Sequence, residues 1–372
     1  MKMGVEGQSL TAEDQLFLLT QAALYLTITR GFAAPEVRVC QQRVESCCHS
    51  LNRPLVLHSA LMGQWRYSFI TDKVTVAMQI ATRISSLAQE QKDAALLLGA
   101  SRALACTQYF LGDFETARQS ALRGLQIWHS GEIKSHVQGE YPPIIACLVD
   151  KAQAEWHLGE IESSQATIAE AIALAKKLNE MLGITEALFF AAWLGHYLRN
   201  PAEVERLASD VIEISTRQNF AHYLSRATIL RGWARSAAGD TVQGISWIEA
   251  GIQDWWGAGS TLCSPYFLAP KAEALHLADR TSEALEAIKE GEAHAERFQE
   301  RWWCAELHRL KGVFLTALGA DEAQIEALFC EAIRIAKEQK SISLERRAEA
   351  TYAEYCRQKA SASGGQGFRL SL

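Results

Sequence analysis

The chain has 372 residues, of which 48% are hydrophobic and 22% are charged, so it can bury a large core and is neither disordered nor low in complexity. Its 37 basic and 43 acidic residues give a formal net charge of −6. The two signs are interleaved, which excludes the basic stripe typical of a protein that binds duplex nucleic acid.

The sequence also lacks the segments that direct a chain to or across a membrane. Residues 1–15 have no basic flank leading into an apolar run, so we expect no secretory signal. The most apolar stretch, 187–198, is interrupted by Gly195 and His196 and is shorter than the roughly 20 residues of a membrane span. Nine scattered cysteines without a C-x-x-C pair suggest free thiols in a reducing compartment. We therefore expect a cytoplasmic protein.

One turn pattern recurs along the chain, in which a short Gly- or Asp-containing segment joins two stretches of helical periodicity. Its clearest copies are Leu111-Gly112-Asp113-Phe114-Glu115-Thr116-Ala117, Leu158-Gly159-Glu160-Ile161-Glu162-Ser163-Ser164, Ala238-Gly239-Asp240-Thr241-Val242-Gln243-Gly244 and Ala278-Asp279-Arg280-Thr281-Ser282-Glu283-Ala284. Weaker copies end at Val37, Ala77, Glu205 and Ile325. Successive copies are 39 to 47 residues apart, and most intervals are close to 40. This periodicity indicates repeated helix pairs, which bury their apolar faces only by stacking on one another.

In chain order we predict helix pairs at 14–51, 54–90, 93–130, 141–178, 182–218, 221–256, 261–298 and 301–338, and a capping helix at 342–358. The predicted fold class is all-α: a right-handed superhelical α-solenoid of tetratricopeptide-like pairs with a period of about 40 residues, longer than the standard repeat. The repeat domain would span 14–358, between disordered segments at 1–13 and 359–372.

The one long interval predicts a loop insertion at 129–143, between the third and fourth pairs. Gly131, Gly139 and the dipeptide Pro142-Pro143 mark it. Two interpretations remain open, a loop that contacts a ligand and a tolerated surface loop.

Motifs for common catalytic chemistry are missing from the sequence. No Gly-Lys dipeptide occurs, so the phosphate-binding loop of ATPases cannot form. There is no G-x-S-x-G or H-E-x-x-H motif, and the 10 histidines never fall four residues apart on one helix face. We therefore expect a non-enzyme without catalytic residues, metal or cofactor.

Ten tryptophans include the pairs Trp255-Trp256 and Trp302-Trp303. Neighbours on a helix point about 100° apart, so at most one member of each pair would face a groove. Core and inter-repeat packing is the favoured interpretation, and an aromatic ligand cage is the alternative.

In arrays of this kind the first helix of each pair lines the concave face. The spacing around the small positions nominates nine groove residues: Arg66, Arg102, Tyr109, Gln153, His196, Tyr266, Glu273, Glu306 and Arg309. Arginines there would grip a carboxylate of a peptide, and tyrosines would supply rigid contact area. The alternative is that these residues serve helix packing or are solvated charges.

Several stretches resemble a known family. They are Gly31-Phe32-Ala33-Ala34-Pro35-Glu36, Leu111-Gly112-Asp113-Phe114, Ile229-Leu230-Arg231-Gly232-Trp233-Ala234, Pro265-Tyr266-Phe267-Leu268, Glu300-Arg301-Trp302-Trp303-Cys304-Ala305-Glu306-Leu307-His308-Arg309-Leu310-Lys311-Gly312 and Ser343-Leu344-Glu345-Arg346-Arg347-Ala348. From about Leu16 to Cys356 the chain is similar to the C-terminal tetratricopeptide region of bacterial multidomain signalling ATPases. In that family a class III adenylate/guanylate cyclase domain, or a winged-helix or LuxR-type DNA-binding domain, precedes an AAA/STAND-like ATPase. The resemblance implies a sensor or scaffold region, and no catalytic residue of those domains has a counterpart here.

Three functions follow as hypotheses. The first is a protein-interaction scaffold in bacterial signal transduction that binds a protein or peptide in its concave groove, the partner being a cyclase, ATPase or transcription-regulator component. The second is the effector-sensing region of an adenylate cyclase or ATP-dependent transcriptional regulator, split or truncated from its catalytic domains, with a small-molecule effector. The third, a cryptic enzyme, has no positive sign in the sequence.

Overall fold

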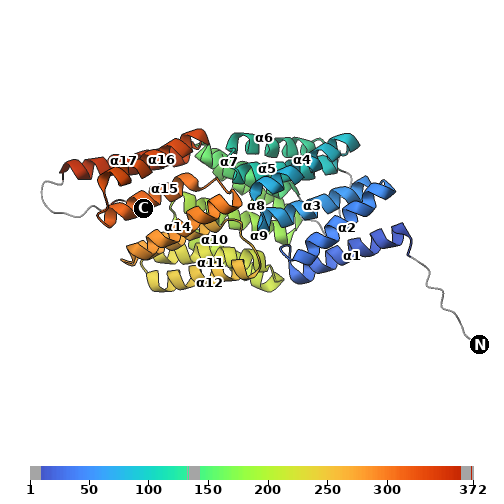
Figure 1. Cartoon of the computed structure of the whole chain (residues 1–372), viewed down its shortest axis with the longest axis horizontal. Coiled ribbons are helices and arrows are strands. Elements are labelled where there is room, and N and C mark those ends of the chain that lie inside the picture. Colours follow the sequence, from blue (N-terminus) through green and yellow to red (C-terminus); the bar gives the residue numbers. More distant parts are fainter. Residues whose placement is uncertain (1–9, 132, 134–142, 362–369, 371–372) are drawn as a thin grey trace, which may run out of the picture.

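The computed structural model describes residues 10–131, 133, 143–361 and 370, and these residues form helices joined by short turns, with no strand among them. The helices are α1 (Ala12–Arg30), α2 (Pro35–Leu51), α3 (Pro54–Thr71), α4 (Val74–Gln91), α5 (Ala94–Phe110), α6 (Phe114–His129), α7 (Pro143–His157), α8 (Ile161–Leu178), α9 (Met181–Tyr197), α10 (Pro201–Gln218), α11 (Ala221–Ala237), α12 (Thr241–Gly257), α13 (Ser264–Leu277), α14 (Thr281–Phe298), α15 (Cys304–Ala317), α16 (Glu322–Glu338) and α17 (Ile342–Ser361). Successive antiparallel pairs stack into a superhelix (Figure 1). The predicted tetratricopeptide-like α-solenoid is confirmed. None of the described helices is long and apolar enough to span a bilayer.

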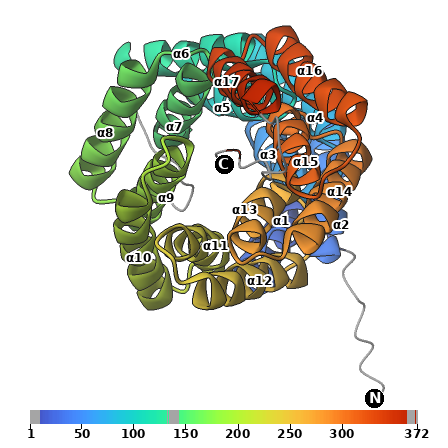
Figure 2. The ribbon, with the colours of Figure 1, turned by 90° about the vertical axis from the view of Figure 1, so that its left-hand side faces the viewer.

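The two helices of a pair differ in burial, and this sets which one faces inward. The first helix, such as α7, is buried along nearly its whole length, whereas the second, such as α10, buries one stripe at Val204, Leu207, Ala208, Val211 and Ser215. That spacing is the single apolar face of an amphipathic helix. Seen along the superhelix axis, α7, α9 and α11 form the inner layer, and α8, α10 and α12 the outer layer (Figure 2).

The recurring turn pattern has a local physical cause. Gly112 has φ 84°, a conformation that glycine adopts without steric cost. The next residue, Asp113, caps α6 by accepting a hydrogen bond from the backbone N–H of Thr116. A left-handed residue followed by an N-cap therefore ends one helix and starts its antiparallel partner within three residues.

Glycines inside helices allow the closest pair contact, between α11 and α12. A Cβ on Gly232 would lie 2.6 Å from the carbonyl oxygen of Gly244 and 2.9 Å from the backbone nitrogen of Ile248. Both atoms belong to the backbone and cannot move aside. The small residues at these positions therefore set the separation of the two helices.

Several predicted boundaries are wrong by a few residues. Helix α1 begins at Ala12, inside the segment 1–13 predicted to be disordered, because Thr11 and Asp14 form a capping box. Helix α17 continues to Ser361, beyond the predicted end at 358, and Lys359 ties its last turn to Glu322 and Glu326 of α16. Most of the predicted loop insertion (132 and 134–142) and most of both predicted disordered segments (1–9, 362–369 and 371–372) lie outside the described residues.

The Trp302-Trp303 pair also departs from expectation. Helix α15 begins at Cys304, not at 301, so both tryptophans lie in the turn before it. Both rings are buried, with exposed fractions of 0% and 1%. Because the two residues are not in a helix, their side chains need not point about 100° apart. Both rings pack in the core.

The superhelix completes a turn after five pairs and then contacts itself. The N–H of Thr261, before α13, donates to the carbonyl of Ile70 at the end of α3, and the N–H of Arg301, before α15, donates to that of Phe110 at the end of α5. Ser343, at the start of α17, donates to the carbonyl of Trp156 at the end of α7. The last carbonyls of a helix have no partner within it, so the contacts at Ile70 and Phe110 satisfy backbone groups that would otherwise need water, whereas the Trp156 carbonyl also accepts from the N–H of Gly159 at 3.0 Å.

Candidate binding surface on the inner face

The inner face repeats with the helices. Glu186, Arg226, Tyr266 and Glu306 each lie forty positions after the one before, and so do Gln153, Trp193, Trp233 and Glu273. The two series are seven residues apart on each shared helix, which is two helical turns, so they share one face. That face divides into two regions, which differ in how their buried carboxyl and guanidinium groups are paired.

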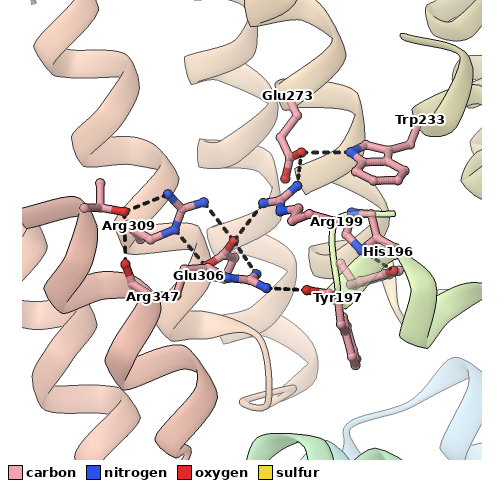
Figure 3. A network of polar contacts seen from close by, with 10 residues as sticks. His196, Tyr197, Arg199, Trp233, Glu273, Glu306, Arg309 and Arg347 are labelled. Carbon is pink, nitrogen blue, oxygen red and sulfur yellow. Dashed lines mark hydrogen bonds and ion pairs between the residues drawn. The ribbon is translucent and has the colours of Figure 1, made fainter. Parts of the chain in front are cut away.

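The first region, here called the seam, joins successive superhelical turns and draws its residues from the first helices α5, α7, α9, α11, α13 and α15, the turns beside them, and α17. It consists of Tyr109, Trp156, His157, His196, Tyr197, Arg199, Trp233, Tyr266, Glu273, Trp302, Trp303, Glu306, Arg309 and Arg347. Figure 3 shows its charged part, with the Glu306 carboxylate at the centre.

Three guanidiniums surround Glu306, which is 1% exposed. Arg309 donates to both of its carboxylate oxygens at 2.9 Å, and Arg347 and Arg199 reach one oxygen at 3.0 and 3.4 Å. Burial alone would raise the pKa of Glu306, but the positive charges of Arg309, Arg347 and Arg199 keep that pKa well below its usual range. Glu306 is therefore ionised and shared among helices from both turns.

The other charged groups of the seam are also paired, although His196 Nε2, Arg199 Nε and Trp303 Nε1 have no hydrogen-bond partner. Arg199 donates to Glu273 at 2.5 Å, and the same carboxylate oxygen accepts from the indole N–H of Trp233 at 2.8 Å. Arg347 donates to the backbone carbonyl of Tyr197 at 2.7 Å, which joins α17 to the end of α9 (Figure 3). These contacts hold the second superhelical turn on the first.

Aromatic rings fill the space between the two turns. Tyr266 stacks on Trp193 with ring centroids 4.1 Å apart, and Tyr197 stacks on Trp156 at 4.2 Å. The hydroxyl of Tyr109 lies 2.9 Å from that of Tyr197. Such contacts combine large buried area with partners for the polar tips.

The histidines of the seam are neutral. His157 contacts the Tyr109 hydroxyl at 3.2 Å and the Ser341 hydroxyl at 2.9 Å, and burial keeps its pKa well below the usual value. Burial also lowers the pKa of His196 to about 3, and its Nδ1 lies 2.8 Å from the Tyr266 hydroxyl.

The second region, here called the inner wall, consists of Arg66 on α3, Arg102 on α5, Asp150 and Gln153 on α7, Glu186 on α9 and Arg226 on α11. Four of these side chains are more than nine-tenths buried, with exposed fractions of 7% for Asp150, 2% for Gln153, 7% for Glu186 and 5% for Arg226. Each nevertheless has a buried polar atom without a hydrogen-bond partner: Asp150 Oδ2, both amide atoms of Gln153, Glu186 Oε2 and Arg226 Nε. Buried polar groups are normally satisfied, so this concentration is unusual.

Burial shifts the carboxyl groups of the inner wall towards their neutral form. Burial raises the pKa of Asp150 to about 7, against the opposing charge of Arg102. Burial also raises the pKa of Glu186 to about 7, against the charges of Arg102, Arg226 and Arg66. Desolvation therefore outweighs the arginines here, whereas the arginines prevail at Glu306 in the seam.

The nine residues nominated from the sequence divide between the two regions. Arg66, Arg102 and Gln153 lie in the inner wall, whereas Tyr109, His196, Tyr266, Glu273, Glu306 and Arg309 lie in the seam, where they contact one another or other residues of the chain. The sequence interpretation thus found inward-facing positions but did not separate the residues of the seam from Gln153, whose two amide atoms have no hydrogen-bond partner.

Sequence reasoning missed Asp150, Glu186, Arg226, Arg199 and Arg347. Arg226 lies forty residues before the nominated Tyr266, and Glu186 lies forty residues before Arg226. The repeat period alone could therefore have identified both as inward-facing. Arg199 occupies the turn position that is glycine at Gly112 and Gly159, and it has φ 55° there. An arginine where the pattern favours glycine could also have indicated a functional residue. No such signal pointed to Asp150 or Arg347.

Among the described residues, no group of three or more His, Cys, Asp or Glu side chains could hold a metal ion. The polar groups of the inner wall belong to side chains suited to hydrogen bonding and charge recognition. Their arrangement suits binding.

No family model matches this sequence. An uncharacterized protein of Rhizobium meliloti (strain 1021) is 21% identical over 356 residues, which cover 94% of this chain and 34% of that protein. The chain therefore spans about a third of the length of this relative.

Several solved structures have a similar backbone. NprR in complex with its cognate peptide NprX gives a TM-score of 0.59 at 13% identity, covering 96% of each chain. A Rap protein complexed with Competence and Sporulation Factor gives 0.56 at 11% identity, covering 94% of this chain and 99% of the other. The Rap conjugation gene regulator of plasmid pLS20 with the Phr* peptide gives 0.53 at 12% identity, covering 96% and 98%. At these identities the likeness establishes the fold, a tetratricopeptide-like α-solenoid.

Proposed function

We propose that this chain is a non-catalytic binding module that holds a peptide, or an extended segment of a partner protein, against its inner wall. The unmet polar atoms of Asp150, Gln153, Glu186 and Arg226 carry the proposal. A buried polar atom without a partner costs about 1–3 kcal/mol, and a ligand that supplies the missing partner recovers that cost on binding.

The composition of the inner wall favours a peptide over a compact metabolite. Its residues come from five successive first helices, from Arg66 on α3 to Arg226 on α11, so the surface is long and follows the superhelix. It offers both donors and acceptors, and Gln153 has one of each. A peptide backbone alternates N–H and C=O groups and suits such a surface. The complexes of NprR with NprX and of a Rap protein with Competence and Sporulation Factor are precedents for ligands on this fold.

A selection from synthetic peptides tests the proposal. A pool of heptapeptides with randomised sequence is equilibrated with the purified chain, and retained peptides are identified by mass spectrometry. We expect the retained peptides to bind Gln153→Ala about tenfold more weakly, because two groups of the ligand lose their partners. Gln126→Ala, on the exposed outer side of α6, is the matched control and should bind like the unchanged chain. Retention that is indifferent to Gln153 would refute inner-wall binding.

A second proposal concerns the protein to which such a module belongs. The relative from Rhizobium meliloti is about three times as long as the matched segment, so arrays of this kind occur within larger proteins. We propose that this chain serves as the effector-sensing regulatory region of a cyclase or ATP-dependent transcriptional regulator. Sequencing the flanking DNA tests this: a neighbouring nucleotide-binding domain supports the proposal, and unrelated neighbours contradict it.

A further inference from the structure

We propose that Arg226 is an anion-binding site within the inner wall and that it grips a carboxylate of the bound peptide. This inference rests on the proposed function, because it names the chemical group that the ligand presents to the inner wall.

Arg226 is a buried cation for which the described residues provide no counterion. Its exposed fraction is 5%, and no carboxylate of the described residues lies within ion-pair distance of it. Its one hydrogen bond, from a terminal guanidinium nitrogen to Nε2 of His222 at 3.1 Å, goes to a neutral ring, since a guanidinium can only donate. Burial, with the charges of Arg226 and Arg66, keeps the pKa of His222 well below its usual value. The Nε atom of Arg226 has no partner.

Aromatic rings enclose the Arg226 side chain. The central guanidinium carbon lies 4.0 Å from the ring centre of Phe189 and between 5.4 and 5.6 Å from those of Phe190, Trp193, Tyr223 and Trp255. These rings hold the group in place and attract it, but they cannot neutralise its charge. Buried charges in proteins are ordinarily paired, so this arrangement fits a site whose counterion arrives with a ligand.

The positive charge of Arg226 favours an anion over a cation. Arg226 acts on the nearby Glu186 carboxyl, but burial raises the pKa of that carboxyl to about 7, so Glu186 compensates the charge only in part at neutral pH. A ligand carboxylate would supply the compensating charge, whereas a lysine or an amino terminus would add to the positive charge.

Planar donors make a carboxylate the fitting anion. A guanidinium donates two parallel hydrogen bonds to a carboxylate, which is stronger and more directional than a contact to a single point charge. Protonated Asp150 and Glu186 can each add an O–H donor. A peptide can supply the carboxylate from its C-terminus or from an Asp or Glu side chain.

Four pools of N-acetylated heptapeptides with otherwise uncharged residues separate these cases. The first ends in a free carboxylate. The second is amidated and contains one internal aspartate. The third is amidated and uncharged, and the fourth is amidated and contains one lysine. Binding is measured for the unchanged chain and for Arg226→Met, Arg226→Lys and Arg231→Met. Arg231 is the matched control because it lies on the same helix but pairs with Glu205 at 3.2 Å and lies over Trp247.

We expect the free-carboxylate or the aspartate pool to bind at least about tenfold more tightly than the uncharged pool, as charge-assisted hydrogen bonds require. Arg226→Met should abolish this preference, Arg226→Lys should retain part of it, and Arg231→Met should retain all of it. If only the first pool shows this preference, Arg226 binds the C-terminal carboxylate of the peptide. If only the second pool shows it, Arg226 binds an acidic side chain. The comparison of pools on the unchanged chain gives an answer even if a variant fails to fold.

Equal or tighter binding of the uncharged or lysine pool would overturn the inference. If Gln153→Ala weakens that binding, the proposed function stands and only the anion site fails. If no pool binds the unchanged chain, the peptide-binding function fails as well.

Discussion

The seam and the inner wall are built from the same face of the same kind of helix, yet they treat buried charge in opposite ways. In the seam, Glu306 is ionised and bonded by three arginines. In the inner wall, Glu186 is drawn towards neutrality, and Arg226 has no carboxylate partner within the described part of the chain. The same repeat position therefore holds a residue that contacts other parts of the chain in the later pairs, at Tyr266 and Glu306. In the earlier pairs, at Glu186 and Arg226, it holds a residue with a polar atom that has no partner.

The difference follows from the geometry of a superhelix that closes after five pairs. The last pairs meet the first across the seam, so their inward groups find partners from another turn, as Arg347 of α17 does at Tyr197 of α9. On α7 and α9 these contacts involve the C-terminal ends of the helices, at Trp156 and Tyr197, whereas Asp150 and Glu186 lie further from those ends. The unmet oxygens of Asp150 and Glu186 therefore lie on a part of the inner face away from these contacts.

Breaking the seam should have the largest effect. Glu306→Gln leaves Arg309, Arg347 and Arg199 buried around a neutral amide. Removing one partner from a buried charge network costs about 3–5 kcal/mol, so we expect a large fall in the unfolding free energy. Urea denaturation followed by circular dichroism measures it. Arg334→Gln, which disrupts exposed pairs with Glu331 and Glu338 on α16, is the control and should cause no measurable change. A loss no greater than that of the control would contradict the role of the seam.

Acid should weaken the seam next. Burial lowers the pKa of His196 to about 3 and that of His157 well below its usual value, whereas both would have values near 6.5 in the unfolded chain. Below pH 6.5 the unfolded state then binds more protons, so stability falls as pH falls. Glu306 and Glu273, with lowered pKa values, add a further loss below about pH 4.5. Small-angle scattering from pH 7 to pH 4 should show the particle extending as the turns separate. If the radius of gyration stayed unchanged although acid had broken the seam contacts, those contacts would not be what holds the two superhelical turns together.

The inner wall should respond to pH with the opposite sign. The pKa of Glu186 is raised to about 7, so between roughly pH 4.5 and pH 7 the folded state binds more protons than the unfolded state. This group therefore lowers stability as pH rises through that window. Glu186→Gln removes the effect, and we expect its melting temperature to exceed that of the unchanged chain at pH 8 by more than it does at pH 5. Glu249→Gln, at a half-exposed carboxylate on α12, is the control. Equal shifts at both pH values would show that Glu186 is not held neutral by burial.

The smallest effect concerns an exposed ion pair between the two superhelical turns, outside the seam residues. Lys340 and Glu115 form an ion pair at 2.5 Å between α6 and the turn before α17, but the two side chains are 69% and 42% exposed. Water and salt screen such a pair. Lys340→Ala should leave the melting temperature unchanged within error, at both low and high salt. A clear loss would mean that surface charges, and not the buried network, join the two turns.

The repeat, the turn chemistry and the inward-facing positions could be predicted from the sequence because each depends on residues within one pair. Gly112 and Asp113 end one helix and start the next whatever the rest of the chain does. The period of forty residues relates Tyr266 to Arg226 and Glu186, so these two residues of the inner wall could also have been predicted from the sequence.

The partners across the seam could not be predicted, because they depend on how small rotations between pairs add up over a superhelical turn. Nothing local relates Ser341 to His157, which are 184 residues apart, or Arg347 to Tyr197. For the same reason the sequence could not separate Glu306, which has three arginine partners, from Glu186, which has an unmet oxygen.

The most direct test of this contrast is the apo stability of Arg226→Met beside that of Glu306→Gln. Methionine fills much of the space of arginine among the aromatic rings and removes a buried charge that has no counterion among the described residues, and an unpaired buried charge is costly to keep out of water. We predict that Arg226→Met melts at or above the temperature of the unchanged chain, whereas Glu306→Gln melts far below it. A loss in Arg226→Met as large as that in Glu306→Gln would show that Arg226 supports the fold, and would contradict a region kept for a ligand.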